Sequence, residues 1–132
     1  MRINKRLLLT GVLTSFVLSA NAGVMTDTTD NKLDQYRGQG AENFSPEAGL
    51  ELWRSDNNGR SCTQCHGANP TDVGKHAKTG KVIKPMAPSV NPKRLTDSKK
   101  IDKWFLRNCK WTLKRECTSQ EKGDFLVWLR EQ

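Results

Sequence analysis

Apolar residues in this chain recur with the spacing of helices. Leu33 and Tyr36 lie on one side of residues 30–36, which are expected to form a short helix. No window alternates apolar and polar residues over the length of a strand, and β-branched and aromatic residues do not gather into strand-like runs. The pattern therefore predicts an all-α fold.

A second helix is predicted to begin after Ser45. Serine is a preferred N-cap, Pro46 suits the first helical position, and Glu47 lies near the positive end of the helix dipole. The turn-forming residues 56–59 are expected to end this helix. Residues 67–95, rich in Gly, Pro and Lys, are expected to lack regular structure. A loop this long in a small domain is usually functional or wraps around another group.

Two further helices are predicted toward the C-terminus. The first starts near residues 96–98 and places Ile101, Trp104, Phe105 and Asn108 at i, i+3, i+4 and i+7, which is one continuous face. The second opens with the capping-box pattern of residues 118–121. Its apolar side is expected to pack on that of the second helix. The two sides comprise Phe125, Trp128 and Leu129, and Gly49, Leu52 and Trp53.

The first 22 residues have the three parts of a secretory signal. Arg2, Lys5 and Arg6 form a basic start, residues 7–18 an apolar core, and residues 20–22 a small-residue cleavage site. We expect residues 1–22 to be cleaved on export to the periplasm, leaving residues 23–132 as one domain.

The charge of residues 23–132 is moderately positive, with 19 Lys or Arg against 14 Asp or Glu. This excess favours docking to acidic partners, although the lysines are scattered along the sequence and equally describe a solvated surface. A nucleic-acid partner is not expected after export.

The run SCTQCHG carries the chemistry. Cys62, Cys65 and His66 have the spacing of a c-type haem attachment site. Each thiol would add to one haem vinyl group, and the adjacent imidazole would reach the iron from the same side. A structural zinc site usually requires a second closely spaced pair of ligands, but seven residues separate Cys109 from Cys117. A redox-active dithiol would want a βαβ context, which is missing.

The ligand on the far side of the iron would decide the function, and the residues leave it open. Met86 would give a conventional electron carrier. His76 would give bis-histidine ligation, although a histidine among lysines is usually a surface residue. Asn108 extends the apolar face expected to meet the haem, but asparagine is also a common helix C-cap. In an oxidising compartment Cys109, the next residue, is expected to form a disulfide with Cys117.

From residue 62 onward the chain resembles the sphaeroides haem protein (SHP) family of exported monohaem cytochromes c. The resemblance rests on SCTQCHGA, on TGKVIKPMAPSVNPKRLTDSKKIDKWFLRNCKWTLKREC and on EKGDFLVWL. It implies that Asn108 is a distal ligand that holds ferric iron and swings away on reduction, and that Cys109 and Cys117 are the family's disulfide. It also implies a dihaem cytochrome c as electron donor and O2 or NO as ligand. Met86 departs from the aliphatic residue expected in this loop.

Taken together, the sequence predicts a class I cytochrome c-like fold around one covalently bound haem c. The favoured function is a periplasmic protein that accepts electrons and binds a diatomic ligand once reduced. The alternatives are an electron carrier with fixed His66 and Met86 ligation and a terminal enzyme that reduces a small oxidant. The enzyme is the less favoured of these, because no side chain stands out as an acid–base catalyst.

Overall fold

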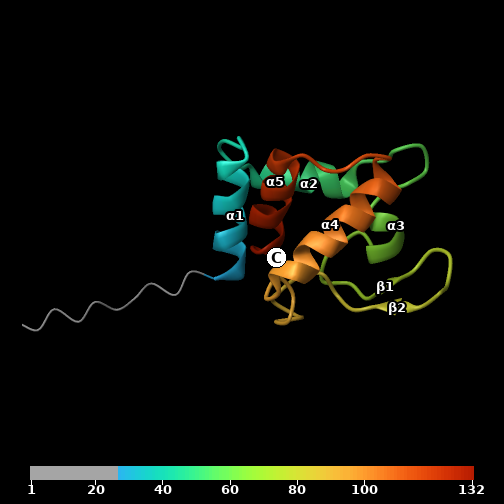
Figure 1. The fold of residues 1–132 in the computed structure, drawn as a ribbon. Coiled ribbons are helices and arrows are strands. Elements are labelled where there is room, and N and C mark those ends of the chain that lie inside the picture. Colours follow the sequence, from blue (N-terminus) through green and yellow to red (C-terminus); the bar gives the residue numbers. More distant parts are fainter. Residues whose placement is uncertain (1–26) are drawn as a thin grey trace, which may run out of the picture.

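The computed structural model describes residues 27–132, so the predicted signal at residues 1–22 lies outside the described residues. Helices dominate, and one small hairpin projects at the edge of the molecule beside α3 (Figure 1). The elements are α1 (Thr28–Gly38), α2 (Pro46–Arg54), α3 (Thr63–His66), β1 (Gly74–Lys75), β2 (Val82–Ile83), α4 (Ser98–Thr112) and α5 (Ser119–Leu129). Within residues 27–132, no helix has the length and apolar character needed to cross a membrane.

The predicted helix starts are confirmed by their caps. The Ser45 hydroxyl accepts the N–H of Ala48 at 3.2 Å. At α5 the capping box is complete: the Thr118 hydroxyl accepts the Glu121 N–H at 3.1 Å, and the Glu121 carboxylate accepts the Thr118 N–H at 2.8 Å. These bonds satisfy backbone donors that have no partner inside the helix.

The backbones of α2 and α5 cross at close range. A Cβ atom at Gly49 would overlap the Asp124 carbonyl oxygen and lie 2.7 Å from the Trp128 Cβ. Glycine therefore allows the two backbones to approach. The predicted partners Trp53, Trp128 and Leu129 form a buried cluster, but Leu50 packs against it where Leu52 was expected. The spacing of apolar residues over a single helical turn does not show which of two nearby positions at the edge of the apolar face makes the contact.

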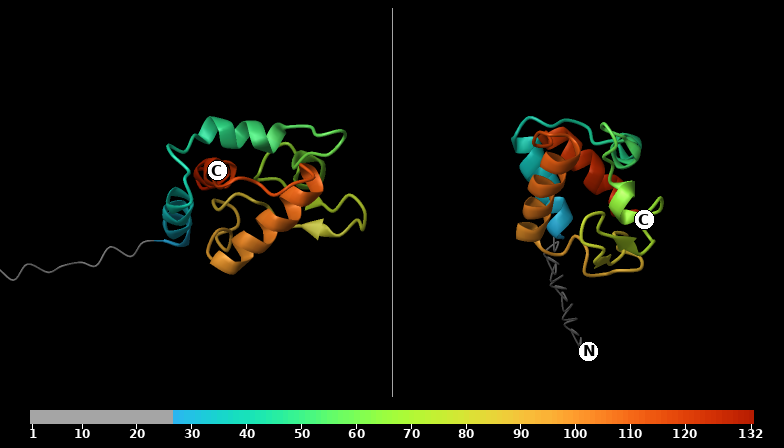
Figure 2. Two further views of the ribbon diagram at one scale, coloured as in Figure 1. Left: turned by 45° about the horizontal axis from the view of Figure 1, so that its top comes forward. Right: turned by 90° about the vertical axis from the view of Figure 1, so that its right-hand side faces the viewer.

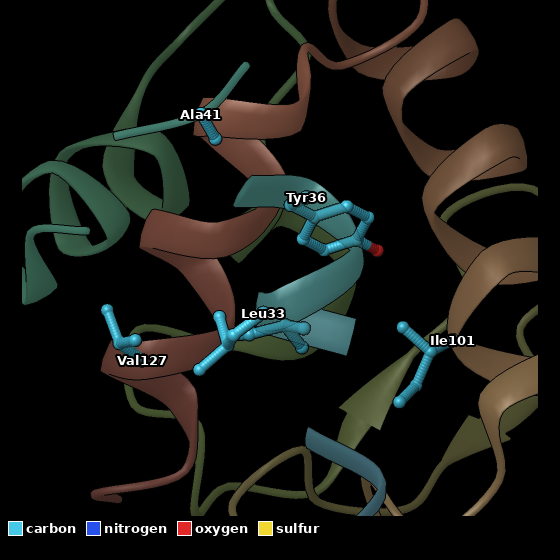
Figure 3. Packing of buried hydrophobic residues seen from close by; sticks show 6 residues of the cluster. Leu33, Tyr36, Ala41, Ile101 and Val127 are labelled. Carbon is cyan, nitrogen blue, oxygen red and sulfur yellow. The ribbon is translucent and has the colours of Figure 1, made fainter. Parts of the chain in front are cut away.

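A second core joins α1, α4 and α5 (Figure 3). Its buried members are Leu33, Tyr36, Ala41, Ile101, Leu126 and Val127. Beside it, the Lys32 ammonium donates to both carboxylate oxygens of Asp102 at 2.6 Å and so links α1 to α4. The Tyr36 hydroxyl is buried and has no hydrogen-bond partner in the described part of the chain. Burial raises the pKa of Tyr36, and the Asp102 carboxylate raises it further.

The continuous face predicted for α4 is divided in the structure. Ile101 is buried and Phe105 half-buried, but Trp104 remains 45% exposed and Asn108 is exposed. Ile101 and Phe105 contact the core shared with α1 and α5, whereas Trp104 and Asn108 lie farther around the helix. In the right-hand view of Figure 2, α4 stands on one side of the molecule and α3 with the hairpin on the other.

The expectation of no regular structure in residues 67–95 is wrong in one place. β1 and β2 pair antiparallel, with Gly74 opposite Ile83 and Lys75 opposite Val82. Gly80 turns the chain with φ +67°. Strands of two residues are too short to produce an alternating pattern, which is why the sequence did not predict them.

Candidate haem site

The cysteine motif forms a single helical turn. Asn58 and Gly59, both with positive φ, reverse the chain after α2 and deliver it to Cys62. The N–H of His66 then donates to the Cys62 carbonyl at 3.0 Å. Because residues i, i+3 and i+4 of a helix share one face, Cys62, Cys65 and His66 lie on the same side. The two cysteines are unbridged and half-buried.

His66 lies against the aromatic core. Its ring centroid is 5.7 Å from that of Trp53, which is itself held by a 3.1 Å hydrogen bond from its indole N–H to the Ala68 carbonyl. Burial, reinforced by the positive charge of Arg94, lowers the pKa of His66 to about 4. Burial likewise raises the pKa of Cys62 to about 11. At neutral pH the imidazole is therefore uncharged, which is the form that binds a metal.

Aromatic side chains build an apolar wall around this turn. Trp53, Phe125 and Trp128 contact one another with centroids 5.2–6.2 Å apart. Phe105 of α4 meets Phe125 edge to face at 5.7 Å. The wall therefore runs from the cysteine motif to the helix that carries Asn108. The sequence pattern predicts Trp53 in the helix–helix contact but not its contact with His66, because no spacing signal connects residues of two different helices.

Met86 lies in a loop that is held in place by hydrogen bonds from its own backbone and from Arg94. Its N–H donates to the Pro70 carbonyl at 2.8 Å, and its side chain packs against the cluster of Trp53 and Trp128. Arg94 fixes the same loop, donating to the Pro85 carbonyl at 2.9 Å and to the Lys84 carbonyl at 2.7 Å. The role of Arg94 is not predictable from the sequence, since an arginine in a basic loop carries no distinguishing signal.

His76 belongs to the hairpin turn. Its Nδ1 accepts the N–H groups of Thr79 at 3.1 Å and Lys78 at 3.3 Å, and the residue is exposed. These two hydrogen bonds give His76 a structural role in stabilising the turn.

Asn108 is not a helix C-cap. α4 continues to Thr112 and is capped by Leu113. The Asn108 side chain is exposed and makes no hydrogen bond within residues 27–132. Trp104 and Trp111, one turn before and after it, are 45% and 40% exposed. This side of α4 thus offers an amide between two large apolar surfaces.

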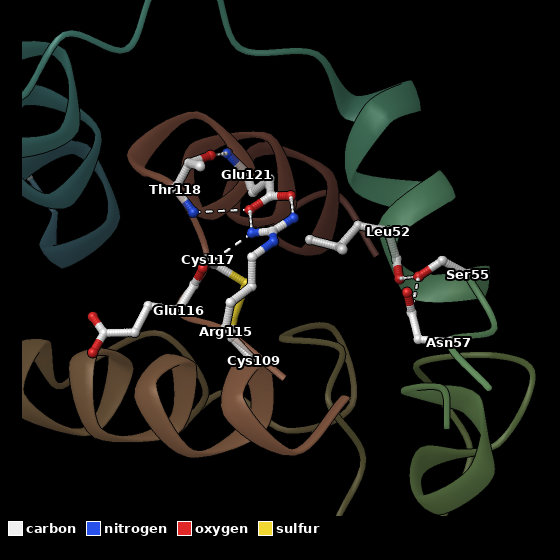
Figure 4. Close-up of polar contacts among 9 residues, drawn as sticks. All are labelled: Leu52, Ser55, Asn57, Cys109, Arg115, Glu116, Cys117, Thr118 and Glu121. Carbon is white, nitrogen blue, oxygen red and sulfur yellow. Dashed lines mark hydrogen bonds and ion pairs between the residues drawn. A yellow bond between two sulfur atoms is a disulfide. The ribbon is translucent and has the colours of Figure 1, made fainter. Parts of the chain in front are cut away.

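A disulfide follows Asn108 directly (Figure 4). Cys109 is bonded to Cys117, as expected from the sequence, with Cα atoms 5.5 Å apart. From the other direction, Arg60 just before the cysteine motif donates to the Trp111 carbonyl at 3.1 Å and lies over the Trp111 ring at 5.4 Å. The end of α4 is thereby connected both to α5 and to the cysteine motif.

These residues fit a covalently attached haem. Two unbridged thiols and a neutral imidazole share one face of a helical turn, and an apolar wall surrounds them. Within residues 27–132, no group of three or more His, Cys, Asp and Glu side chains could hold a metal ion by itself. The iron of a haem needs only axial ligands from the protein, since the porphyrin supplies the rest.

Comparison with protein families and curated proteins agrees with this interpretation. A family model described as a domain of unknown function, DUF1924, matches residues 39–129. The cytochrome c-type protein SHP of Cereibacter sphaeroides is 51% identical over 72 residues, which is 54% of this chain and 55% of that protein. Cytochrome c'' of Methylophilus methylotrophus is 44% identical over 69 residues, or 52% of this chain and 48% of that protein. The matched part of the chain thus spans about half the length of these curated relatives.

Solved structures extend the likeness to nearly the whole domain. Oxidised SHP, described as an oxygen-binding cytochrome c, superposes with a TM-score of 0.75 at 39% identity and covers 80% of this chain and 98% of that one. Oxidised cytochrome c'' from Methylophilus methylotrophus superposes with a TM-score of 0.69 at 30% identity and covers 80% and 94%. The all-α cytochrome c fold predicted from the sequence is therefore confirmed. The chain belongs to the DUF1924 family and to the SHP-type monohaem cytochromes c, and it carries one covalently bound haem c.

Proposed function

We propose that this cytochrome accepts electrons in the periplasm and, once reduced, binds a small diatomic ligand such as O2 or NO. Cys62 and Cys65 tether the haem, and His66 is the proximal ligand. Haem c supplies a one-electron iron centre whose ferrous form has affinity for diatomic π-acceptors. A dihaem cytochrome c, implied by the family resemblance, is the proposed donor.

Asn108 is the proposed distal ligand. An amide oxygen is a weak, hard ligand, so it holds ferric iron better than ferrous iron. Arrival of an electron therefore favours its release. The observation that carries this proposal is the state of Asn108 in the fold: its amide is exposed, makes no hydrogen bond within residues 27–132, and adjoins a disulfide that fixes its backbone. The likeness to an oxygen-binding cytochrome c also supports it.

A conventional electron carrier with Met86 opposite His66 is the second candidate. Met86 packs against the same cluster as Cys62, and its loop is fixed by Arg94. A thioether ligand stabilises ferrous iron and would keep the reduced form closed to gases. The two candidates therefore predict opposite behaviour on reduction.

Optical spectra of the holoprotein test the choice. If Asn108 is the ligand, the ferric protein lacks the red thioether-to-iron absorption band, and the ferrous protein is high-spin and binds carbon monoxide rapidly. Asn108→Ala should change the ferric spectrum, while Met86→Leu, the matched control, should leave it unchanged. A strong thioether band that disappears in Met86→Leu, with a ferrous form inert to carbon monoxide, would overturn the proposal.

A further inference from the structure

The hairpin of β1 and β2 concentrates positive charge. Residues 73–84 contain four lysines and no Asp or Glu. These lysines recur at every third position, and all of them belong to one hairpin that projects from the molecule (Figure 1). They are Lys75, Lys78, Lys81 and Lys84.

The hairpin lysines have no internal partners. All four are exposed, and none makes a side-chain hydrogen bond or ion pair within residues 27–132. Several basic residues elsewhere are neutralised: Lys110 pairs with Glu116 at 3.2 Å, and Arg115 with Glu121 at 2.7 Å. Asp72, the nearest acidic residue in the sequence, precedes the hairpin and forms no ion pair with these lysines, so their ammonium groups stay available to a partner.

Two exposed valines accompany this charge. Val73 is 66% exposed and Val82 74% exposed. Val82 lies directly opposite Lys75 in the hairpin, and cross-strand partners project from the same face. The neighbouring pair, Gly74 and Ile83, projects from the opposite, more buried face. The outer face thus combines apolar contacts with a basic rim, a composition found at protein–protein interfaces.

The hairpin also lies directly on the cysteine motif. A Cβ atom at Gly74 would overlap the Cys65 carbonyl oxygen and lie 2.9 Å from the His66 Cα. A protein seated on the outer face would therefore be separated from Cys65 and His66 by little more than the thickness of the hairpin.

We propose that the outer face of residues 73–84 is the docking surface for an acidic electron-transfer protein. The partner would present carboxylates to the four lysines and an apolar patch to Val73 and Val82. Opposite charges steer such encounters and accelerate association. This inference rests on the proposed electron-accepting function and adds the surface and the charge of the partner.

Stopped-flow reduction of the ferric holoprotein by flavodoxin hydroquinone, an acidic flavoprotein donor, tests the proposal. The variant Lys78→Glu/Lys81→Glu is compared with the charge-matched control Lys99→Glu/Lys103→Glu on α4. At low salt the hairpin variant should react about tenfold more slowly than wild type, with a flatter salt dependence, because steering is lost. The control should stay within about threefold. The milder Lys78→Gln/Lys81→Gln should fall between wild type and the hairpin variant.

Equal slowing by both Glu variants would show that only net charge matters and would overturn the proposal. An unchanged rate in the hairpin variants would do the same. Lumiflavin semiquinone, a small neutral reductant, should reduce every variant at the wild-type rate. A slower reduction of the hairpin variants by lumiflavin would show that the haem itself is altered and would reject a docking role. Reduction is measured whichever ligand lies opposite His66, so this result is independent of the test of Asn108.

Discussion

The disulfide between Cys109 and Cys117 joins α4 to the residue that precedes the N-cap of α5. Both cysteines are buried, at 6% and 7% exposure. Around them, Arg115 binds Glu121 through two hydrogen bonds, so the connection between the helices is closed by covalent and polar contacts together. The residue immediately after Asn108 is thus covalently linked to the start of α5.

Removal of this disulfide should destabilise the holoprotein. Replacing Cys109 and Cys117 with serine is expected to lower the free energy of unfolding by about 2–3 kcal/mol, because the unfolded chain regains the freedom of the closed loop. Guanidinium chloride unfolding followed by tryptophan fluorescence measures the change. A double variant as stable as wild type would show that the Arg115–Glu121 contact and the helix packing suffice to hold the junction.

The close crossing of α2 and α5 predicts a steric effect at Gly49. A methyl group there meets the Asp124 carbonyl and the Trp128 side chain, so Gly49→Ala should cost about 1–3 kcal/mol of stability. Gly38→Ala on α1 is the matched control: nothing lies within 4 Å of its added Cβ, and its φ is not positive. The control should be neutral or stabilising by up to about 1 kcal/mol. Equal losses in both variants would contradict the steric explanation.

Local signals in the sequence predicted much of the fold and of the haem attachment. Caps at Ser45 and Thr118 fix helix starts through bonds to residues three positions away, so a short stretch of sequence contains all partners. The proposed haem-attachment residues also lie within one helical turn, so their common face follows from spacing alone. The disulfide was predictable because the unpaired cysteines in an exported chain leave few pairings.

Features that depend on distant partners were not predictable. The contact of Trp53 with His66 and the pairing of Lys32 with Asp102 each join different helices. Arg94 binds within its own loop, but no local pattern shows which carbonyl groups a loop arginine will reach. The division of the α4 face into buried and exposed parts has the same origin. Periodicity identifies a face, but only the packing of α1 and α5 decides how much of it is covered.

The ion pair at the start of α5 predicts a pH effect. Hydrogen bonds from Arg115, and then from the Thr118 backbone, hold the pKa of Glu121 below its ordinary value. A depressed folded-state pKa gives stability that is present above the unfolded pKa of about 4.3 and lost as pH falls through the folded value. Glu121→Gln should therefore be less stable than wild type by up to about 1 kcal/mol at pH 7, since surface pairs contribute little more.

Urea unfolding of both proteins at pH 7 and pH 3 measures this difference. The gap in unfolding free energy between wild type and Glu121→Gln should narrow at pH 3, because this pH lies below the unfolded pKa of about 4.3 and protonation of the unfolded chain then opposes the ion pair. Lys110→Gln, which removes a more exposed ion pair with Glu116, is a control for general surface charge. A gap that stays constant with pH would show that the carboxylate charge is not responsible.

The ion pair between α1 and α4 predicts an asymmetric response to mutation. The Lys32 side chain is 5% exposed, whereas that of Asp102 is 53% exposed. Asp102→Ala leaves a buried ammonium with only Gln35 as partner and should cost about 3 kcal/mol, because an unpaired buried charge is strongly destabilising. Lys32→Met leaves a carboxylate that water can reach and fills the space with an apolar side chain. Its cost should be below about 1.5 kcal/mol.

Denaturant unfolding of the two single variants and of Lys32→Met/Asp102→Ala measures this asymmetry. If the penalty arises from the buried ammonium, Lys32→Met should rescue most of the loss caused by Asp102→Ala, and the double variant should be more stable than Asp102→Ala alone. Additive losses, or a larger loss for Lys32→Met, would contradict the electrostatic explanation. They would indicate instead that each side chain stabilises the fold through contacts other than the ion pair.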